Sequence, residues 1–257
     1  MIHLALVGIG TGNPDHLTGA AIQALNNADL ILLPRKGAAK SDLVDLRREI
    51  CASCVTAPVR VIEFDLPVRA ETGPYLDRVH DWHAAIADVW TEQIAAHLPH
   101  GGHRVALLVW GDPSLYDSTL RIAGRLKASG MALQVEVIPG ITSLQALTAA
   151  HAVPLNDLGA PVLITTGRRL RAEGWPEGAS RVAVMLDQGC AFDVLSPEGT
   201  YIWWGAYLGM THQHLIAGPL ADVSGTIRRD RSRLRALHGW IMDIYLLHRA
   251  ISAPIRA

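Results

Sequence analysis

Apolar runs of about six residues alternate with longer amphipathic segments through the first half of the chain. The runs expected to form strands cover residues 2–7, 29–34, 59–64, 104–110 and 133–138. The intervening segments have apolar residues at helical spacing, best developed from Tyr75 to His97. The run from Arg104 to Trp110 does not alternate with polar residues, which is typical of a central parallel strand buried on both faces. This rhythm predicts a parallel sheet with helices on both faces.

The pattern changes after Gly140. A helix is expected over 141–151, followed by a Pro- and Gly-bearing stretch and by strands over 162–165, 182–186 and 201–204. The connections between these strands are rich in turns, and a long helix from about Arg233 to Ile251 is expected to close the chain. We therefore predict an α/β protein of two domains, a parallel-sheet domain over 1–140 and a mixed-sheet α+β domain over 141–257, with the exact boundary open between Gly140 and Pro161.

Composition narrows the class of protein. The 257 residues are 49% hydrophobic and carry a formal net charge of -1, so a general nucleic-acid or membrane partner is not expected. No apolar stretch approaches the roughly 20 residues that cross a bilayer. The start Met1-Ile2-His3 lacks the basic region of a secretory signal, which favours a cytoplasmic location. Any anionic ligand must then meet local basic clusters.

Two of the three cysteines, Cys51 and Cys54, form a C-x-x-C pair. A zinc site of this type needs a second pair of ligands, and a redox motif should open a helix after a strand. This pair instead closes a helix that contains Leu46 and Ile50. We expect no metal site.

The first predicted strand leads into a turn with glycines at positions 8, 10 and 12, followed by Asn13-Pro14. Such a turn exposes backbone amides to a ligand, because glycine lacks Cβ. A dinucleotide fingerprint needs G-x-G-x-x-G and an acid about 20 residues on, whereas here the spacing is G-x-G-x-G and Asp29 opens the next strand. A binding loop and a tight turn without a ligand both remain open, and the helix is expected to start at Asp15 or Thr18.

Three other features lie where ligands bind in such sheets. Gly111-Asp112-Pro113 directly follows the buried strand, and Pro139-Gly140-Ile141-Thr142-Ser143 follows the strand over 133–138. Met185 ends a strand of the second half, where a thioether could line an apolar slot. Each has an ordinary alternative, namely an Asp-Pro turn, helix caps and plain core.

The order of these motifs resembles that of the tetrapyrrole methylases, S-adenosylmethionine-dependent enzymes that methylate uroporphyrinogen and corrin precursors. The resemblance covers essentially the whole chain. It implies two α/β domains meeting at a trough for S-adenosylmethionine, a homodimer, and methyl transfer without a metal. The implied step is direct displacement at the sulfonium methyl by an electron-rich ring carbon, for which alignment and exclusion of water suffice.

The resemblance also implies a donor site. The family usually has Gly-Pro-Gly-Asp where this chain has Gly10-Thr11-Gly12-Asn13, so the contact at Thr11 departs from the pattern. Met185 and Ala206 would flank the adenosine from the second domain. The full set of implied donor contacts is Thr11, Trp110, Gly111, Asp112, Leu115, Thr142, Ser143, Met185 and Ala206.

Four segments resemble a corrin-pathway subgroup that also releases a two-carbon unit as acetate: 8–18, 36–43, 204–209 and 239–243. Acetate release needs water and a general base, and the sequence does not choose among twelve histidines and acids such as Asp15, Asp112 and Asp187. The resemblance implies a polycarboxylate tetrapyrrole as substrate, which basic side chains should meet. We expect substrate contacts at Asn13, Arg35, Lys36, Tyr116, Arg168 and Arg169, and a solvated basic helix face at Arg228, Arg229, Arg231, Arg233 and Arg235. The alternatives are a family methylase acting on precorrin-2 and a nucleotide-binding module without catalysis.

Overall fold

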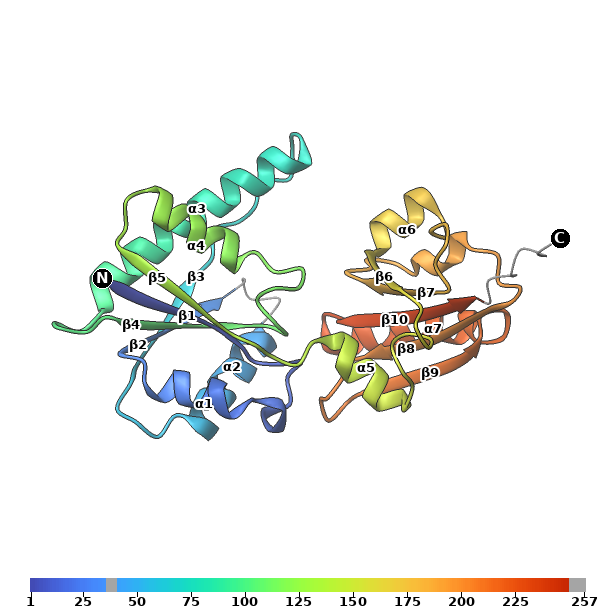
Figure 1. Ribbon diagram of the computed structural model, residues 1–257, viewed down its shortest axis with the longest axis horizontal. Coiled ribbons are helices and arrows are strands. Elements are labelled where there is room, and N and C mark those ends of the chain that lie inside the picture. The colour runs from blue at the N-terminus through green and yellow to red at the C-terminus, as the bar shows by residue number, and fades with distance from the viewer. Residues whose placement is uncertain (36–40, 250–257) are drawn as a thin grey trace. The chain divides into compact units, whose positions relative to one another are not determined.

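The protein is described by a computed structural model that covers residues 1–35 and 41–249 (Figure 1). Its contacts divide the chain into two compact units, Met1–Thr142 and Ser143–Ala257. Each unit is built around a five-stranded sheet with helices packed against it. The predicted α/β class is confirmed.

The sheet of the first unit is entirely parallel, as predicted. Its strand order is β3-β2-β4-β1-β5, so the central strands β4 and β1 are adjacent. Leu6 of β1 lies opposite Leu107 of β4 on one side and Val137 of β5 on the other. The strands are β1 (Ile2–Gly8), β2 (Leu30–Arg35), β3 (Arg60–Asp65), β4 (Arg104–Val109) and β5 (Leu133–Ile138).

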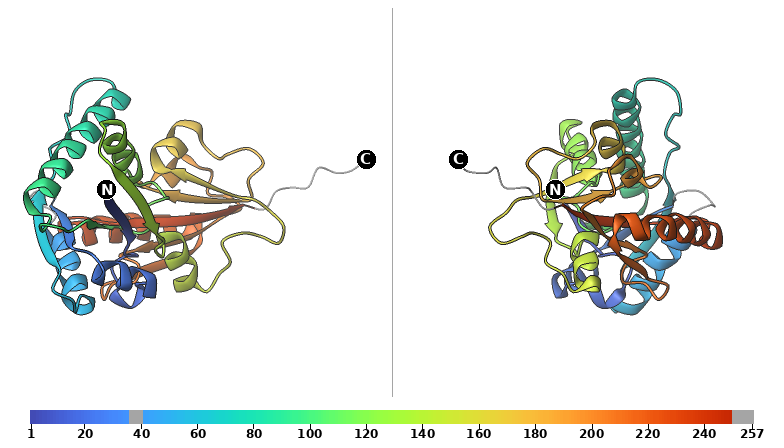
Figure 2. Two further views of the ribbon diagram at one scale, coloured as in Figure 1. Left: turned by 60° about the vertical axis from the view of Figure 1, so that its left-hand side comes forward. Right: turned by 90° about the vertical axis from the view of Figure 1, so that its right-hand side faces the viewer.

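Helices cover both faces of this sheet (Figure 1). The helices α1 (Gly19–Asn26) and α2 (Ser41–Cys54) share one apolar cluster with it, and α3 (Tyr75–His97) and α4 (Thr119–Ala128) share the other. The long helix α3, in turquoise, is shown from two further sides in Figure 2. Because β1 and β4 lead into helices on opposite faces, their carboxyl ends form a switch point, where ligands bind in open α/β sheets. Within the described residues, no helix combines the length and apolarity needed to cross a bilayer.

The second unit has a mixed sheet in the order β6-β7-β10-β8-β9, in which only β6 and β7 pair in parallel. The helices α5 and α7 pack against β8 and β9, and α6 packs against β6 and β7. The strands are β6 (Val162–Thr166), β7 (Arg181–Met185), β8 (Thr200–Ala206), β9 (His214–Pro219) and β10 (Asp243–Arg249). The helices are α5 (Ser143–His151), α6 (Gly167–Glu173), the short 3-10 helix η3 (Ala191–Val194) and α7 (Leu220–His238).

The predicted closing helix from Arg233 to Ile251 is wrong. The helix α7 covers Leu220–His238 and ends at Gly239, which takes a left-handed φ of 73°. The chain then forms β10, whose apolar residues Ile244 to Leu247 lie at the centre of the sheet. A short apolar run fits a buried strand and a helix equally well. Gly239 indicates a helix end before this run, which favours a strand. Residues beyond Arg249 lie outside the described part of the chain.

The cysteine pair closes α2, as predicted. Cys51 is buried against the sheet, and both thiols are free. Burial raises the pKa of Cys51 to about 12 and also raises the pKa of Cys54. Neither thiol has the lowered pKa of a reactive cysteine.

Candidate functional site

The three turns that follow β1, β4 and β5 meet at glycines. Gly111 N donates to Gly10 O at 2.8 Å, and Gly10 N donates to Gly111 O at 3.3 Å. A Cβ on Gly8 would lie 2.6 Å from Gly140 N, and a Cβ on Gly140 would lie 2.2 Å from Gly111 O. Real Cβ atoms do not approach so closely, so only glycine fits at Gly8 and Gly140. The structure therefore brings the three predicted turns of this unit together.

Asp112 joins two of these turns. Its Oδ2 accepts from Gly140 N at 2.9 Å, and its Oδ1 accepts from Ser114 N at 2.8 Å and from the Ser114 hydroxyl. The residue is 8% exposed. Burial acts to raise the pKa of Asp112, but the hydrogen bonds from Ser114 and Gly140 outweigh it and hold the pKa below its ordinary value. The ionised carboxylate thus fixes the position of the Gly140 turn.

We expect Asp112→Asn to lower the free energy of unfolding by about 1–3 kcal/mol at pH 7, because a buried acceptor for two backbone amides is altered. The folded-state pKa of Asp112 is depressed, so its stabilisation is present above the unfolded-state value near 4 and is lost as the pH falls through the folded-state value. The difference between variant and parent should shrink on acidification. Urea denaturation at several pH values measures both effects, and Asp15→Asn, at an exposed position, is the control. Equal stability of Asp112→Asn and the parent at pH 7 would contradict the role of Asp112 in holding the Gly140 turn.

The first turn carries a buried hydroxyl. Thr11 is 5% exposed, and its Oγ1 has no hydrogen-bond partner among the residues that the structure describes. A buried polar atom of this kind usually has a hydrogen-bond partner, so the Thr11 hydroxyl is a candidate contact for a ligand atom. Asn13 instead bonds locally, since its Oδ1 accepts from Asp15 N at 2.9 Å and caps a short 3-10 helix, η1 (Pro14–His16). Of the two predicted caps, Thr18 is the one that starts α1.

The other predicted site residues of this unit surround the same strand ends. Trp110 and Leu115 flank the Gly111-Asp112 turn and are half-buried, and Thr142 is half-buried two residues after Gly140. Tyr116 is 44% exposed. Asp29 lies elsewhere, because its Oδ2 accepts from His103 N and Arg104 N at the beginning of β4. The acid needed by a dinucleotide fingerprint is therefore engaged at the opposite edge of the sheet.

In the second unit, Met185 and Ala206 lie at one edge of the sheet, on either side of β10. Val184 of β7 and Trp204 of β8 both lie opposite Tyr245. Met185 follows Val184 as the last residue of β7, and Ala206 ends β8 opposite Asp243. Met185 is half-buried and Ala206 is fully buried. Ser143, by contrast, is the first residue of α5.

Five described residues other than glycine have left-handed backbone angles, and three of them directly follow a predicted donor contact. Tyr116 (φ 51°) follows Leu115, Leu186 (φ 52°) follows Met185, and Tyr207 (φ 51°) follows Ala206. Such angles are costly for side chains with a Cβ and cluster at functional sites. Sequence reasoning missed them, because a tyrosine or leucine gives no local signal for this conformation.

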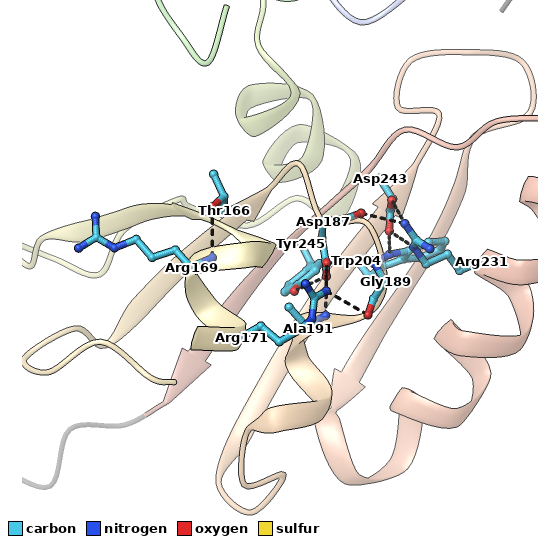
Figure 3. A network of polar contacts seen from close by, with 10 residues as sticks. All are labelled: Thr166, Arg169, Arg171, Asp187, Gly189, Ala191, Trp204, Arg231, Asp243 and Tyr245. Carbon is cyan, nitrogen blue, oxygen red and sulfur yellow. Dashed lines mark hydrogen bonds and ion pairs between the residues drawn. The ribbon is translucent and has the colours of Figure 1, made fainter. Parts of the chain in front are cut away.

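A buried polar network holds the same edge of the second unit (Figure 3). The side chain of Asp187 is 1% exposed and accepts from Arg171, Gly189 N, Ala191 N and the Tyr245 hydroxyl. Asp243 accepts from Trp204 Nε1 at 3.0 Å and from Arg231 Nε at 2.8 Å. Arg231 also donates to the backbone oxygen of Asp187 at 2.8 Å, which links the Asp243 carboxylate to the backbone of Asp187.

The basic residues predicted to contact the substrate have different surroundings in the structure. Arg35 makes a two-pronged ion pair with Asp65, with distances of 3.0 and 2.9 Å, at the end of β2. Arg168 and Arg169 are exposed on α6, where Arg169 pairs with Glu173 one turn later. Lys36 lies outside the described residues. The expected solvated face of the last helix is wrong at Arg231, which is buried in the network above.

Comparison with known proteins identifies the class. A family model of the tetrapyrrole (corrin/porphyrin) methylases matches residues 3–224. The chain belongs to this family.

Individual relatives extend the match over nearly the full length. Precorrin-6A synthase [deacetylating] of a Sinorhizobium species is 49% identical over 252 residues, which cover 97% of this chain and 96% of the relative. The crystal structure of the cobalamin synthesis related protein CobF of Corynebacterium diphtheriae has a TM-score of 0.81 at 37% identity, over 97% of this chain and 99% of that one.

A more distant structure shares the fold. The uroporphyrin-III C-methyl transferase of Thermus thermophilus, solved with S-adenosylhomocysteine, has a TM-score of 0.58 at 18% identity, over 96% of this chain and 92% of that one. The fold thus persists in the family at low identity.

Proposed function

We propose that the protein is an S-adenosylmethionine-dependent C-methyltransferase of cobalamin biosynthesis. It methylates precorrin-5 at C1 and releases acetate, giving precorrin-6A. The observation that carries the proposal is the junction of three glycine turns at the ends of β1, β4 and β5, beside the buried Thr11 hydroxyl, which has no hydrogen-bond partner among the described residues. The near full-length similarity to a deacetylating precorrin-6A synthase supports the choice of substrate.

The donor fits the residues at these strand ends. The Thr11 hydroxyl is available to a polar atom of the donor, and a Cβ on Gly111 would have nothing within 4 Å. The backbone N–H and C=O groups of Gly10 and Gly111 bond to each other, so this turn offers the donor space and not free amides. Leu115 and the thioether of Met185 are half-buried and offer apolar surface for an adenosine, whereas the fully buried Ala206 enters the set on the family resemblance. The complete proposed set is Thr11, Trp110, Gly111, Asp112, Leu115, Thr142, Ser143, Met185 and Ala206.

Asp112 enters this set as a positioning residue. Its two oxygens already accept bonds from Ser114 and Gly140, so its main contribution is to hold the turns in register. Asp187 does the same for the loop after Met185, since it accepts from the backbone amides of Gly189 and Ala191. Fixed loops of this kind lower the cost of aligning two reactants.

The bound donor supplies a methyl group already activated by its sulfonium sulfur. The protein orients the ring carbon toward that methyl within a near-attack distance and keeps water away from it. Apolar Trp110 and Leu115 suit the exclusion of water, and no acid or base is needed for the displacement itself. The side chains that hold the macrocycle should be basic or polar, and we assign this role to Asn13, Arg35, Lys36, Tyr116, Arg168 and Arg169.

The proposal includes a homodimer, as the family resemblance implies, and a cytoplasmic location. The domain division at 140/141 belongs to it as well. Sedimentation equilibrium of the purified protein tests the assembly, and a monomer at micromolar concentration would contradict it.

The activity is tested by incubating the purified protein with methyl-labelled donor and either precorrin-5 or precorrin-2. We expect label in precorrin-5, together with acetate in equal amount. Label in precorrin-2 alone would replace the assignment by the C20-methyltransferase alternative.

Calorimetry separates an enzyme of this family from a nucleotide-binding module. We expect the protein to bind S-adenosylhomocysteine and not NAD. Tight binding of NAD with no binding of S-adenosylhomocysteine would overturn the methylase assignment. Asp112→Ala should weaken the binding of S-adenosylhomocysteine and lower turnover.

A further inference from the structure

Release of acetate demands a group that the methyl transfer does not use. Resting on the proposed function, the reaction must break a carbon–carbon bond between the macrocycle and an acetyl group. Water is the reagent that converts an acetyl group to acetate, and it must lose a proton to a nearby base to attack a carbonyl carbon. Acetate release therefore needs a side chain that can take this proton.

The buried carboxylates are already occupied. Asp112 accepts from Ser114 and Gly140, Asp187 accepts from four donors, and Asp243 accepts from Arg231 and Trp204. Each is bonded to donors that hold it in place, which leaves it a poor acceptor for a water proton. The histidines are the remaining candidates for a proton acceptor.

His214 and Asp230 form a carboxylate–imidazole pair. His214 Nε2 lies 2.8 Å from Asp230 Oδ2, and the two side chains are 34% and 25% exposed. If Nε2 carries the proton donated to Asp230, Nδ1 is the nitrogen that can accept one. Within residues 1–35 and 41–249, Nδ1 has no hydrogen-bond partner in the protein, and the exposure of the side chain admits water. His248 is a weaker case, because its Nε2 lies 3.5 Å from Asp157.

The pair lies at the edge of the sheet that carries the proposed donor contacts of this unit. His214 begins β9 directly opposite Ala206, the last residue of β8. The pairing of β8 with β10 places Asp243 on the other side of Ala206. The ring of His214 packs edge-on against Trp204, with centroids 6.0 Å apart, which restrains its orientation. Asp230, on α7, fixes the other end of the ring.

We propose that His214 is the general base for acetate release and that Asp230 is its positioning residue. Nδ1 takes a proton from water as the water oxygen bonds to the acetyl carbonyl carbon. The bond from that carbon to the ring then breaks, and its electron pair stays on the ring carbon, which bonds to the transferred methyl group. The two-carbon unit leaves as acetic acid, which ionises to acetate, and the imidazolium returns its proton to solvent.

The test compares His214→Ala with His248→Ala in the full-length protein. Acetate release from precorrin-5 should fall at least about 100-fold in His214→Ala, the usual cost of losing a general base, and stay within about twofold in His248→Ala. Added imidazole should restore part of the rate in His214→Ala only. Binding of S-adenosylhomocysteine should be unchanged in both variants, because neither side chain is a proposed donor contact.

Asp230→Asn should lower acetate release by about tenfold or more and leave the thermal midpoint close to the parent's, with no rescue by imidazole. Acetate release at the parent rate in His214→Ala would overturn the proposal. A loss that imidazole does not restore, accompanied by lost binding of S-adenosylhomocysteine, would show a structural role and overturn it as well. An unmodified protein that releases no acetate from precorrin-5 contradicts the proposed function instead, so the two failures are distinguishable.

Discussion

Gly140→Ala should abolish most activity and destabilise the first unit. The added Cβ would lie 2.2 Å from Gly111 O and 2.7 Å from Gly8 C, and both are backbone atoms that cannot move aside by a rotamer change. The turn must shift, which breaks the 2.9 Å bond from Gly140 N to Asp112. We expect a loss of about 3 kcal/mol in the free energy of unfolding. Affinity for S-adenosylhomocysteine should fall about 100-fold or more, because a displacement of about 1 Å in a binding site can cost that much.

Gly124→Ala is the matched control. Gly124 is exposed in the middle of α4, where nothing lies within 4 Å of an added Cβ. This substitution should raise the free energy of unfolding by up to about 1 kcal/mol, since alanine is the better helix former. Urea denaturation and calorimetry measure both variants. Retention of parental affinity in Gly140→Ala would show that the junction of turns does not form the donor site.

The fold of the first unit could be predicted because its signals are local. Its strands are short apolar runs and its helices have apolar residues at regular spacing, as in α3, whose bounds of Tyr75 and His97 match the prediction. In the second unit, the sheet places β10 between β7 and β8, although it follows them in sequence. The signal for β9 and β10 is therefore long-range pairing, which periodicity does not contain, and the apolar run of β10 was predicted as helix.

The candidate site also has features that the sequence predicts and features that it does not. Glycine spacing pointed to the turns at Gly10, Gly111 and Gly140, because a missing Cβ is visible in the sequence. The ion pairs and left-handed residues were not visible, since Arg231 meets Asp243 only when α7 packs on the sheet. The basic residues of α7 illustrate this well: one arginine is buried while its neighbours on the same helix stay exposed.

Arg231→Met should destabilise the second unit by about 3–5 kcal/mol, the usual effect of removing one partner of a buried ion pair. Among the described residues, the variant leaves the Asp243 carboxylate, whose side chain is 3% exposed, with Trp204 as its one donor. It also leaves Asp187 O without its bond from Arg231. Burial already raises the pKa of Asp243, and without Arg231 nothing of comparable strength opposes that effect. A raised folded-state pKa favours the protonated acid, so the deficit should shrink as the pH falls below the new value.

Arg228→Met is the control on the same helix. It removes the Arg228–Asp193 pair, whose side chains are 49% and 41% exposed, and should cost less than about 1 kcal/mol. In the double variant Arg231→Met/Asp243→Asn, the amide removes the unpaired charge, so part of the lost stability should return. Urea denaturation followed by tryptophan fluorescence measures all three. A deficit in Arg231→Met that is independent of pH and unaffected by Asp243→Asn would mean that packing of the arginine stem, and not charge pairing, holds α7 to this edge.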